Sequence, residues 1–362
     1  MLAGATAVAA LPLMPRRALS TNMGAKTLRA APASVQIAPD GYPQTEIWSY
    51  GGTVPGTEIR MRQGDRLRRK LVNALPEPTS LHWHGIRIDN AMDGVPGVTQ
   101  EAVPPGGEFL YEFDLPDAGT YWYHSHNQSY EQVARGLQGA LIVEEAEAPD
   151  VDREEVLVLD DFRLDPESGQ IAGFDNMHDF SHGGRVGNIA VTNGVFNKTL
   201  PVKQNERLRL RLLNTANAKI FQLQLQGLEG WIVALDGMPL EAPQPFPETL
   251  LLAPAQRADL IVDVTADEGG EAHLIRLERE EGFSHVLFEV QGRASESRRP
   301  DPAPLPPNPQ MEVAGLDDAL RSTLRMEGGA MRGFETARMD GRAVGFREAA
   351  QERKFWAMNG MV

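Results

Sequence analysis

The sequence predicts an all-β protein made of tandem β-sandwich domains, and three observations support this prediction. The 362 residues include 35 glycines and 26 prolines, which divide the chain into short segments. Many of these segments alternate apolar and polar residues or are rich in branched and aromatic residues, as the strands of sandwiches and barrels are. In addition, residues 63–73 are echoed at 204–214: each begins in turn residues, continues as an alternating strand and ends in Asn. Such an echo indicates a repeated domain.

Composition excludes several classes of protein. The formal net charge of -15 argues against nucleic acid or an anionic membrane as a partner. No segment is apolar for long enough to predict a membrane span. The chain has no cysteine, which excludes disulfides, iron–sulfur clusters, cysteine nucleophiles and a thiolate-bound blue-copper centre within this chain.

Changes in composition divide the chain into five parts. Residues 1–31 open with an apolar, alanine-rich run typical of an export signal that lacks its basic start, so we expect a periplasmic or secreted protein. The other four parts are a first sandwich, a second sandwich, a proline-bearing linker and the start of a further domain. They span residues 32–147, 148–297, 298–354 and 355–362, respectively.

Two His-x-His tripeptides hold four of the eight histidines, namely His82, His84, His124 and His126. Residues i and i+2 of a strand share a face, so each tripeptide presents two imidazoles side by side. Two such strands that met at one edge would gather four neutral nitrogen ligands. Imidazole suits Cu, Zn, Fe and Ni, so the spacing predicts a metal site without choosing the metal. The alternative is two unrelated pairs of histidines.

The remaining histidines give weaker signals. His178 and His182 have the i,i+4 spacing that would suit a metal on a helix, but their glycine-flanked segment is not expected to be helical. His273 and His285 stand alone on strand-like segments and are expected to be structural.

Longer motifs around the tripeptides resemble a known family. TSLHWHG (79–85), MDGVPGVTQ (92–100), GTYWYHSH (119–126) and GLQGALIV (136–143) resemble the first domain of multicopper oxidases of the laccase-like bacterial type. TNG (192–194), RLRLLN (209–214) and LAPAQRAD (252–259) are similar to the middle domain of that family. The resemblance implies cupredoxin-like Greek-key β-sandwiches, three in the whole enzyme.

The resemblance also implies roles for individual residues. His82 resembles the ligand of the type 2 copper of a trinuclear cluster, and His84, His124 and His126 resemble ligands of its type 3 pair. Asp93 matches the family's acidic residue near the cluster, which is thought to steer water and protons. The alternative for Asp93 is a turn aspartate before Gly94.

One departure limits what this chain is expected to do. The family's other two copper motifs, which supply the cysteine and four further cluster histidines, are absent. We therefore expect the N-terminal two-thirds of an oxidase, with copper as cofactor but half of the cluster ligands, inactive until another chain or domain completes it. The complete enzyme would use O2 and a small phenolic or metal-ion reductant.

Three other functions stay open from the sequence. The chain could be a two-domain copper-sequestering protein without oxidase activity. It could be a zinc or other mononuclear hydrolase that uses three of the four histidines and a bound water. It could also be a structural cupredoxin-like protein that binds no metal.

Overall fold

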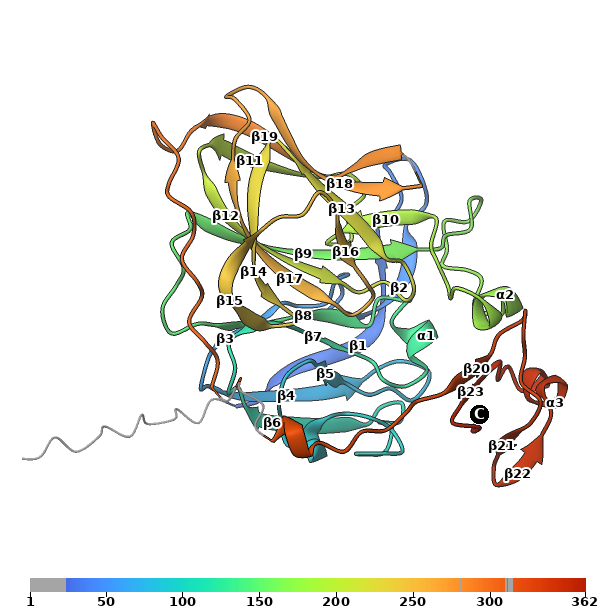
Figure 1. The fold of residues 1–362 in the computed structure, drawn as a ribbon. Coiled ribbons are helices and arrows are strands. Elements are labelled where there is room, and N and C mark those ends of the chain that lie inside the picture. The colour runs from blue at the N-terminus through green and yellow to red at the C-terminus, as the bar shows by residue number, and fades with distance from the viewer. Residues whose placement is uncertain (1–23, 280, 310, 312–314) are drawn as a thin grey trace, which may run out of the picture.

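The fold consists of two β-sandwiches and a small C-terminal module beside them (Figure 1). The computed structural model describes residues 24–279, 281–309, 311 and 315–362. The apolar run expected to be an export signal lies outside these residues. The strand content confirms the predicted all-β class.

The first sandwich packs two four-stranded sheets face to face around an aromatic-rich core. Both sheets are mixed, since β1 runs parallel to β4 and β3 runs parallel to β8. In sheet order, the strands are β2 (Thr45–Tyr50), β1 (Lys26–Val35), β4 (Arg66–Asn73) and β6 (Glu108–Asp114), then β3 (Ile59–Arg62), β8 (Gln138–Glu144), β7 (Gly119–His124) and β5 (His82–His84).

The second sandwich packs a six-stranded sheet against a five-stranded sheet, with an aliphatic core between them. The larger sheet consists of β10 (Ile189–Thr192), β9 (Arg153–Phe162), β12 (Arg207–Asn214), β17 (Arg257–Val264), β14 (Leu228–Leu235) and β15 (Met238–Pro245). The smaller consists of β11 (Lys198–Gln204), β19 (Glu281–Arg293), β18 (Glu271–Glu278), β13 (Phe221–Gln226) and β16 (Leu250–Leu252).

Helices are few and short, and the C-terminal module is formed by small paired strands. The helices are η1 (Asn90–Met92), α1 (Ser129–Gln132), α2 (Met177–Ser181), η2 (Leu316–Asp318) and α3 (Phe346–Gln351). In the module β20 (Met326–Gly328) pairs with β23 (Trp356–Met358), and β21 (Ala337–Met339) pairs with β22 (Arg342–Val344). Among the helices that the structure describes, none has the length and apolarity needed to cross a membrane.

The echoed sequence unit is a structural repeat. Asn73 ends β4 and Asn214 ends β12, and both side chains are fully buried. The amide of Asn73 donates to the carbonyls of Glu77 and Val103, 2.9 and 2.8 Å away. Asn214 donates to the carbonyls of Lys219 and Leu252, each at 2.9 Å. Each asparagine thus supplies partners to buried backbone groups at the same point of its sandwich.

A buried ionic network joins the two sandwiches. Arg209, Arg211 and Asp259 are at most 1% exposed and come from the adjacent strands β12 and β17. The carboxylate of Asp259 accepts from Arg209 at 2.7 Å and from Arg211 at 3.0 Å, and from the hydroxyl of Thr120 on β7 at 2.6 Å. Glu145, just beyond β8, accepts two hydrogen bonds from Arg209. Charges that are buried at this level are tolerated only when they are paired in this way.

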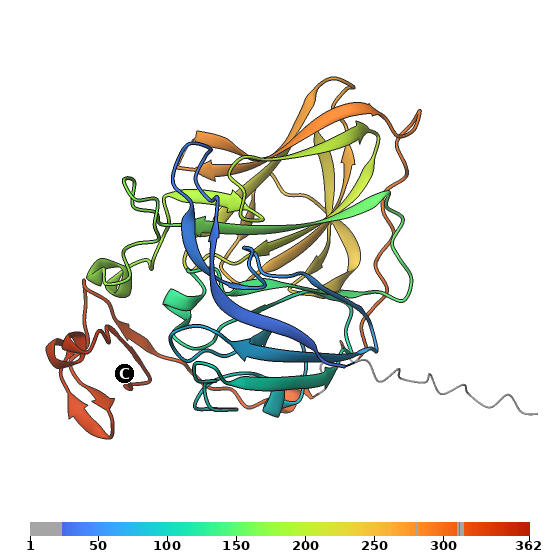
Figure 2. The same cartoon turned by 180° about the vertical axis from the view of Figure 1, so that it is seen from behind.

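The proline-rich segment after β19 straps the two sandwiches together (Figure 2). Leu305 packs against Val233 and Ile261 of the second sandwich. Asn308 pairs with the backbone of Ala118 in the first sandwich, through N–H···Oδ1 at 2.8 Å and Nδ2–H···O at 2.7 Å. The strap therefore contacts both sandwiches within four residues.

Substitution of Asp259 by Asn should cost the chain about 3–5 kcal/mol of unfolding free energy, because it removes the carboxylate that two buried arginines share. Burial opposes ionisation of Asp259, but Arg211 and Arg209 more than offset it and hold its pKa low. The measurement is urea unfolding followed by circular dichroism. The exposed Asp317→Asn is the control, with an expected change below about 0.5 kcal/mol. Equal midpoints for the two variants would contradict the role of the network.

Candidate metal centre

Two neighbouring strands bring the histidine tripeptides together. β5 pairs with β7 in antiparallel register, with His82 opposite His124 and His84 opposite Trp122. The ring centroid of His82 lies 5.6 Å from that of His84, 5.2 Å from that of His124 and 5.3 Å from that of His126. The four rings lie close together, and the two-residue period of a strand accounts for the placement of His82 and His84 on one face.

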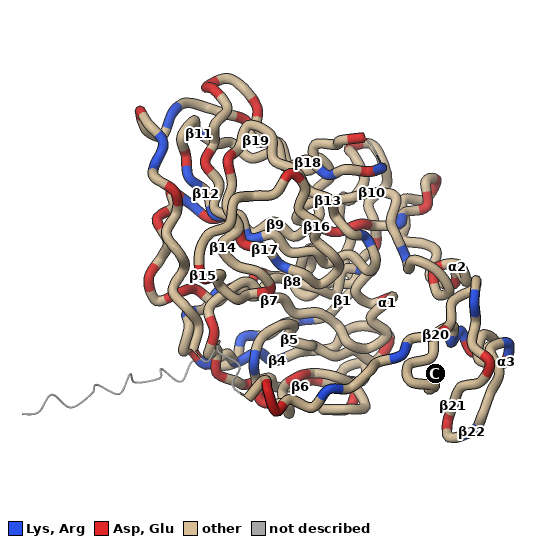
Figure 3. Tube along the Cα trace, in the orientation of Figure 1, with Lys and Arg blue, Asp and Glu red and all other residues tan. Residues whose placement is uncertain are grey.

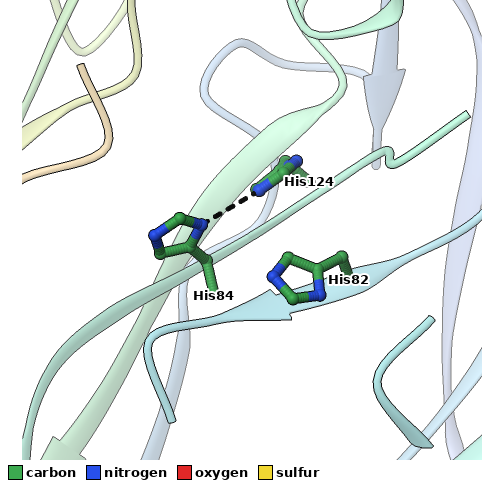
Figure 4. A group of neighbouring side chains, drawn as sticks. All are labelled: His82, His84 and His124. Atoms are coloured by element: carbon green, nitrogen blue, oxygen red, sulfur yellow. Dashed lines mark hydrogen bonds between the residues drawn. The ribbon is translucent and has the colours of Figure 1, made fainter. Parts of the chain in front are cut away.

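Three of the four histidines form a tight ligand group. One nitrogen each of His82, His84 and His124 can be chosen so that all lie within 4.8 Å of one another (Figure 4). His126 lies outside this group, since β7 ends at His124 and the strict alternation of the strand ends with it. Its ring is 6.1 Å from that of His124 and flanks His82.

Backbone carbonyls fix which nitrogen is unprotonated on two of these rings. The Nδ1 of His82 lies 2.7 Å from the carbonyl oxygen of Asp93, and the Nδ1 of His124 lies 2.9 Å from that of Ser125. A carbonyl can only accept, so Nδ1 carries the proton and Nε2 keeps its lone pair in both. His84 differs, since its Nδ1 faces the Nε2 of His124 at 3.3 Å. The arrangement matches the outer hydrogen bonds that orient metal-binding imidazoles.

The main-chain carbonyl of Asp93 makes its shortest contact with His82. Its carboxylate oxygen Oδ1 is 3.3 Å from Nδ1 of His82, farther than its own carbonyl oxygen. Gly94 follows with a φ of 78°, and a Cβ there would lie 1.9 Å from the carbonyl oxygen of Leu81. Only glycine therefore allows this turn to approach the strand that carries His82. Asp93 therefore lies beside His82, in a bend that follows η1, and its role there stays a prediction.

Burial favours the neutral form of His82, His84 and His124. It lowers the pKa of His124 well below its ordinary value, with the neighbouring histidines adding to the effect. It also lowers the pKa of His84 to about 4, with a further contribution from Arg257, and it lowers that of His82. Neutral imidazole is the form that binds a metal.

The group opens onto a groove of about 420 Å³ between the sandwiches. One wall comes from the second sandwich, with Thr215, Asn217 and Ala255, and the other carries the four histidines. The ring of Trp122 packs on that of His124 with 4.1 Å between centroids. Trp83, which lies between His82 and His84, points into the core and is 1% exposed. A small molecule therefore has access to the imidazoles from one side.

The expectation that residues 177–182 are not helical is wrong. Asn176 caps α2, with its side-chain oxygen accepting from the N–H of His178 at 3.0 Å. His178 and His182 thus share one helical turn, and their rings stack at 4.0 Å. Sequence reasoning weighed the flanking glycines and missed the capping asparagine, which is the usual start signal of a helix.

His273 and His285 lie on the strands β18 and β19 of the second sandwich, apart from the four clustered histidines. His273 hydrogen bonds to Ser284 at 3.0 Å, and His285 is 2% exposed with its ring against Phe221.

A buried carboxyl behind the groove was not predicted. Asp160 and Asp161 are each 5% exposed at the end of β9, and neither forms an ion pair among the described residues. Burial and the charge of Asp161 raise the pKa of Asp160 to about 8. Its carboxylate accepts from the N–H of Asp161 at 2.8 Å, from Nε2 of Gln138 at 3.5 Å and from Thr215, which lines the groove. The only signal in the sequence is a pair of acids directly after an apolar run.

The pKa of Asp160 is 3.8 when unperturbed and about 8 in the folded chain. At pH values between these two, folding should therefore be accompanied by binding of a proton at Asp160. Because the folded-state pKa is raised, this group makes the chain less stable as pH rises through that window, by up to about 1.4 kcal/mol per pH unit. Asp160→Asn should flatten the fall of unfolding free energy between pH 5 and about pH 8, whereas the exposed Asp40→Asn should not. Denaturant titrations at several pH values measure this, and identical slopes for Asp160→Asn and the unmodified chain would refute it.

The chain matches family models described as multicopper oxidase over residues 32–148 and 156–285. It is 31% identical to the multicopper oxidase MmcO of Mycobacterium tuberculosis, over 69% of this chain and 53% of that protein. It is 30% identical to copper resistance protein A of Pseudomonas syringae pv. tomato, over 74% of this chain and 51% of that protein. The chain thus spans about half the length of these curated relatives.

Solved structures give the same result. A multi-copper oxidase from Pseudomonas thermotolerans superposes with a TM-score of 0.77 and 38% identity, over 84% of this chain and 72% of that one. Lac15 from a marine microbial metagenome superposes with a TM-score of 0.70 and 44% identity, over 81% of this chain and 73% of that one. Both the sequence and the fold lead to one conclusion: the chain belongs to the multicopper oxidase family.

Proposed function

We propose that this chain supplies the N-terminal half of the ligands of a trinuclear copper centre in a laccase-like multicopper oxidase. The complete enzyme would oxidise phenolic or metal-ion substrates one electron at a time and reduce O2 to water. The observation that carries the proposal is the group of three imidazoles whose ligand nitrogens lie within 4.8 Å of one another. His82 would serve the type 2 copper, and His84, His124 and His126 the type 3 pair. Family membership and the donor chemistry support copper over the other metals that imidazole suits.

The residues of the chain would prepare the site in three ways. Neutral imidazoles present lone pairs without prior loss of a proton. The carbonyls of Asp93 and Ser125 hold two rings in the orientation in which Nε2 faces inward. The carboxylate of Asp93, half-buried beside Nδ1 of His82, would steer protons that O2 reduction consumes. Copper, when bound, would supply the redox chemistry.

The absence of cysteine from the 362 residues supports a second candidate function, copper binding without oxidase activity. A blue-copper site needs a thiolate ligand, and this chain provides none. By itself the chain should then bind copper, lack the intense visible band of a copper–thiolate bond and leave phenolic substrates unoxidised. Location in the periplasm or outside the cell would suit either function.

His82→Ala combined with His124→Ala should abolish copper binding at this group, because two of the three closest nitrogens are removed. The measurement is copper stoichiometry of the full chain after Cu(II) loading and desalting, with electron paramagnetic resonance of the bound ion. His273→Ala is the matched control, since that ring hydrogen bonds to Ser284 on an outlying strand. Unchanged copper in the double variant would overturn the proposal. One zinc per chain in protein purified without added metal would favour the hydrolase alternative.

Copper binding should also withstand mild acid. With the pKa of His84 lowered to about 4, protons compete for its nitrogen only below that pH. Ordinary imidazoles would lose about tenfold in affinity per ligand between pH 7 and pH 5.5, since their pKa is about 6.5. We expect less than about a threefold loss over this range in a competition titration. A fall of about a hundredfold or more would show that the imidazoles titrate normally.

A further inference from the structure

The position of His126 does not follow from strand geometry, because β7 ends two residues before it. Ser125, directly before it, is fully buried, and so is Ser80, which lies two residues before the first histidine tripeptide. The backbone N–H of His126 donates to the hydroxyl of Ser80 at 3.1 Å. The segments that carry the two tripeptides are therefore joined by buried polar groups as well as by the pairing of β5 with β7.

One amide, that of Gln132 in α1, connects the two segments. Gln132 is fully buried. Its Oε1 accepts from the hydroxyl of Ser125 at 2.5 Å and from that of Thr79 at 2.8 Å. Its Nε2 donates to a carboxylate oxygen of Glu77 at 2.8 Å and to the carbonyl oxygen of Pro78 at 2.9 Å. A single side chain thus holds the residue between the second pair of histidines and the residues that lead into the first pair.

The partners of this amide fix its orientation. A carboxylate and a carbonyl can only accept, so the NH2 group of Gln132 must face Glu77 and Pro78. Its oxygen then faces the two hydroxyls, each of which has one hydrogen to donate. A reversed amide would set its oxygen against two other acceptors. Buried networks in which every member is satisfied in this way are rigid and specify one arrangement.

Both hydroxyls of the network belong to residues that lie close to ligands in the sequence. Ser125 separates His124 from His126, and its carbonyl accepts from Nδ1 of His124 at 2.9 Å. Thr79 lies three residues before His82. A displacement of Ser125 would therefore move both the group that orients His124 and the backbone that carries His126.

Helix α1 itself is held on both sides, at the place where the two sandwiches meet (Figure 1). The carbonyl of Tyr130 accepts from Nδ2 of Asn217 in the second sandwich at 2.8 Å. The hydroxyl of Ser129 donates to the carbonyl of Ser125 at 3.1 Å. These contacts give Gln132 a fixed place from which to hold the two segments.

We propose that Gln132 is a positioning residue of the histidine group, which sets the separation of the two His-x-His tripeptides through Ser125 and Thr79. It acts through these neighbours and is not itself a ligand. The inference rests on the function proposed for the four histidines, because it concerns the geometry in which they hold copper.

The test compares Cu(II) binding by the full chain and by its variants. A competition titration gives the affinity, and electron paramagnetic resonance reports the geometry around the bound ion. Gln132→Leu removes both ends of the amide and keeps a side chain of similar size. It should lower the affinity for Cu(II) by about tenfold or more, as loss of the outer partners of metal ligands does. It should also change the hyperfine splitting of the bound ion.

A milder pair of variants separates the hydroxyl from the shape of the side chain. Thr79→Val removes one hydroxyl and keeps the shape, so it should shift both readouts in the same direction by a smaller amount. Thr79→Ser keeps the hydroxyl and should bind copper as the unmodified chain does. Thr192→Val is the matched control, because Thr192 is also fully buried but lies on β10 of the second sandwich, where its hydroxyl donates to the carbonyl of His285 at 3.4 Å. This control should leave affinity and spectrum unchanged.

A role of Gln132 in folding alone would lower the unfolding midpoint and leave the affinity and spectrum of the folded protein as they are. Circular dichroism identifies the variants that fold, and the two Thr79 variants decide the question if Gln132→Leu does not. Equal affinities and spectra for Thr79→Val and Thr79→Ser would overturn the inference, as would unchanged copper binding in a folded Gln132→Leu. An unmodified chain that bound no copper would instead overturn the proposed function, and this inference with it.

Discussion

The carboxylate of Asp259 is the point on which the arrangement of the two sandwiches depends. It is buried and accepts hydrogen bonds from two buried arginines of its own sandwich and from Thr120 of the other. Thr120 lies on β7, four residues before His124. An ionic network of the second sandwich therefore anchors the strand that brings His124 to the histidine group. Such buried networks fix one arrangement because each alternative leaves a charge without its partner.

The interface also sets the electrostatics of the site. The second sandwich forms one wall of the groove beside the histidines, and burial is the main reason that the pKa of His124 is low. Arg257 of β17 is 4% exposed, donates to the carbonyl of Thr120 at 3.1 Å and adds to the lowering of the pKa of His84. The charges of the chain are otherwise mixed, with basic and acidic positions scattered over both sandwiches (Figure 3).

Much of the site could be predicted from the sequence because it depends on local periodicity. The alternation of side chains along a strand places His82 and His84 on one face, and turns the intervening Trp83 into the core. The asparagines at the equivalent ends of β4 and β12 likewise follow from one repeated sequence pattern. The position of His126 could not be predicted in this way, because it depends on where β7 ends. Neither could the partners of Asp259 or the burial of Asp160, which depend on contacts between residues far apart in the sequence.

At position 93 the main chain and the side chain do different things: the main-chain carbonyl accepts the hydrogen bond from His82, and the carboxylate is not needed for it. The carbonyl oxygen that orients the ring belongs to every amino acid, whereas the carboxylate belongs to the side chain alone. Orientation of the ligand is instead sensitive to Gly94, because a side chain there would displace the turn. Position 93 can therefore vary in chemistry during evolution or design without loss of the ligand geometry, while the neighbouring position cannot.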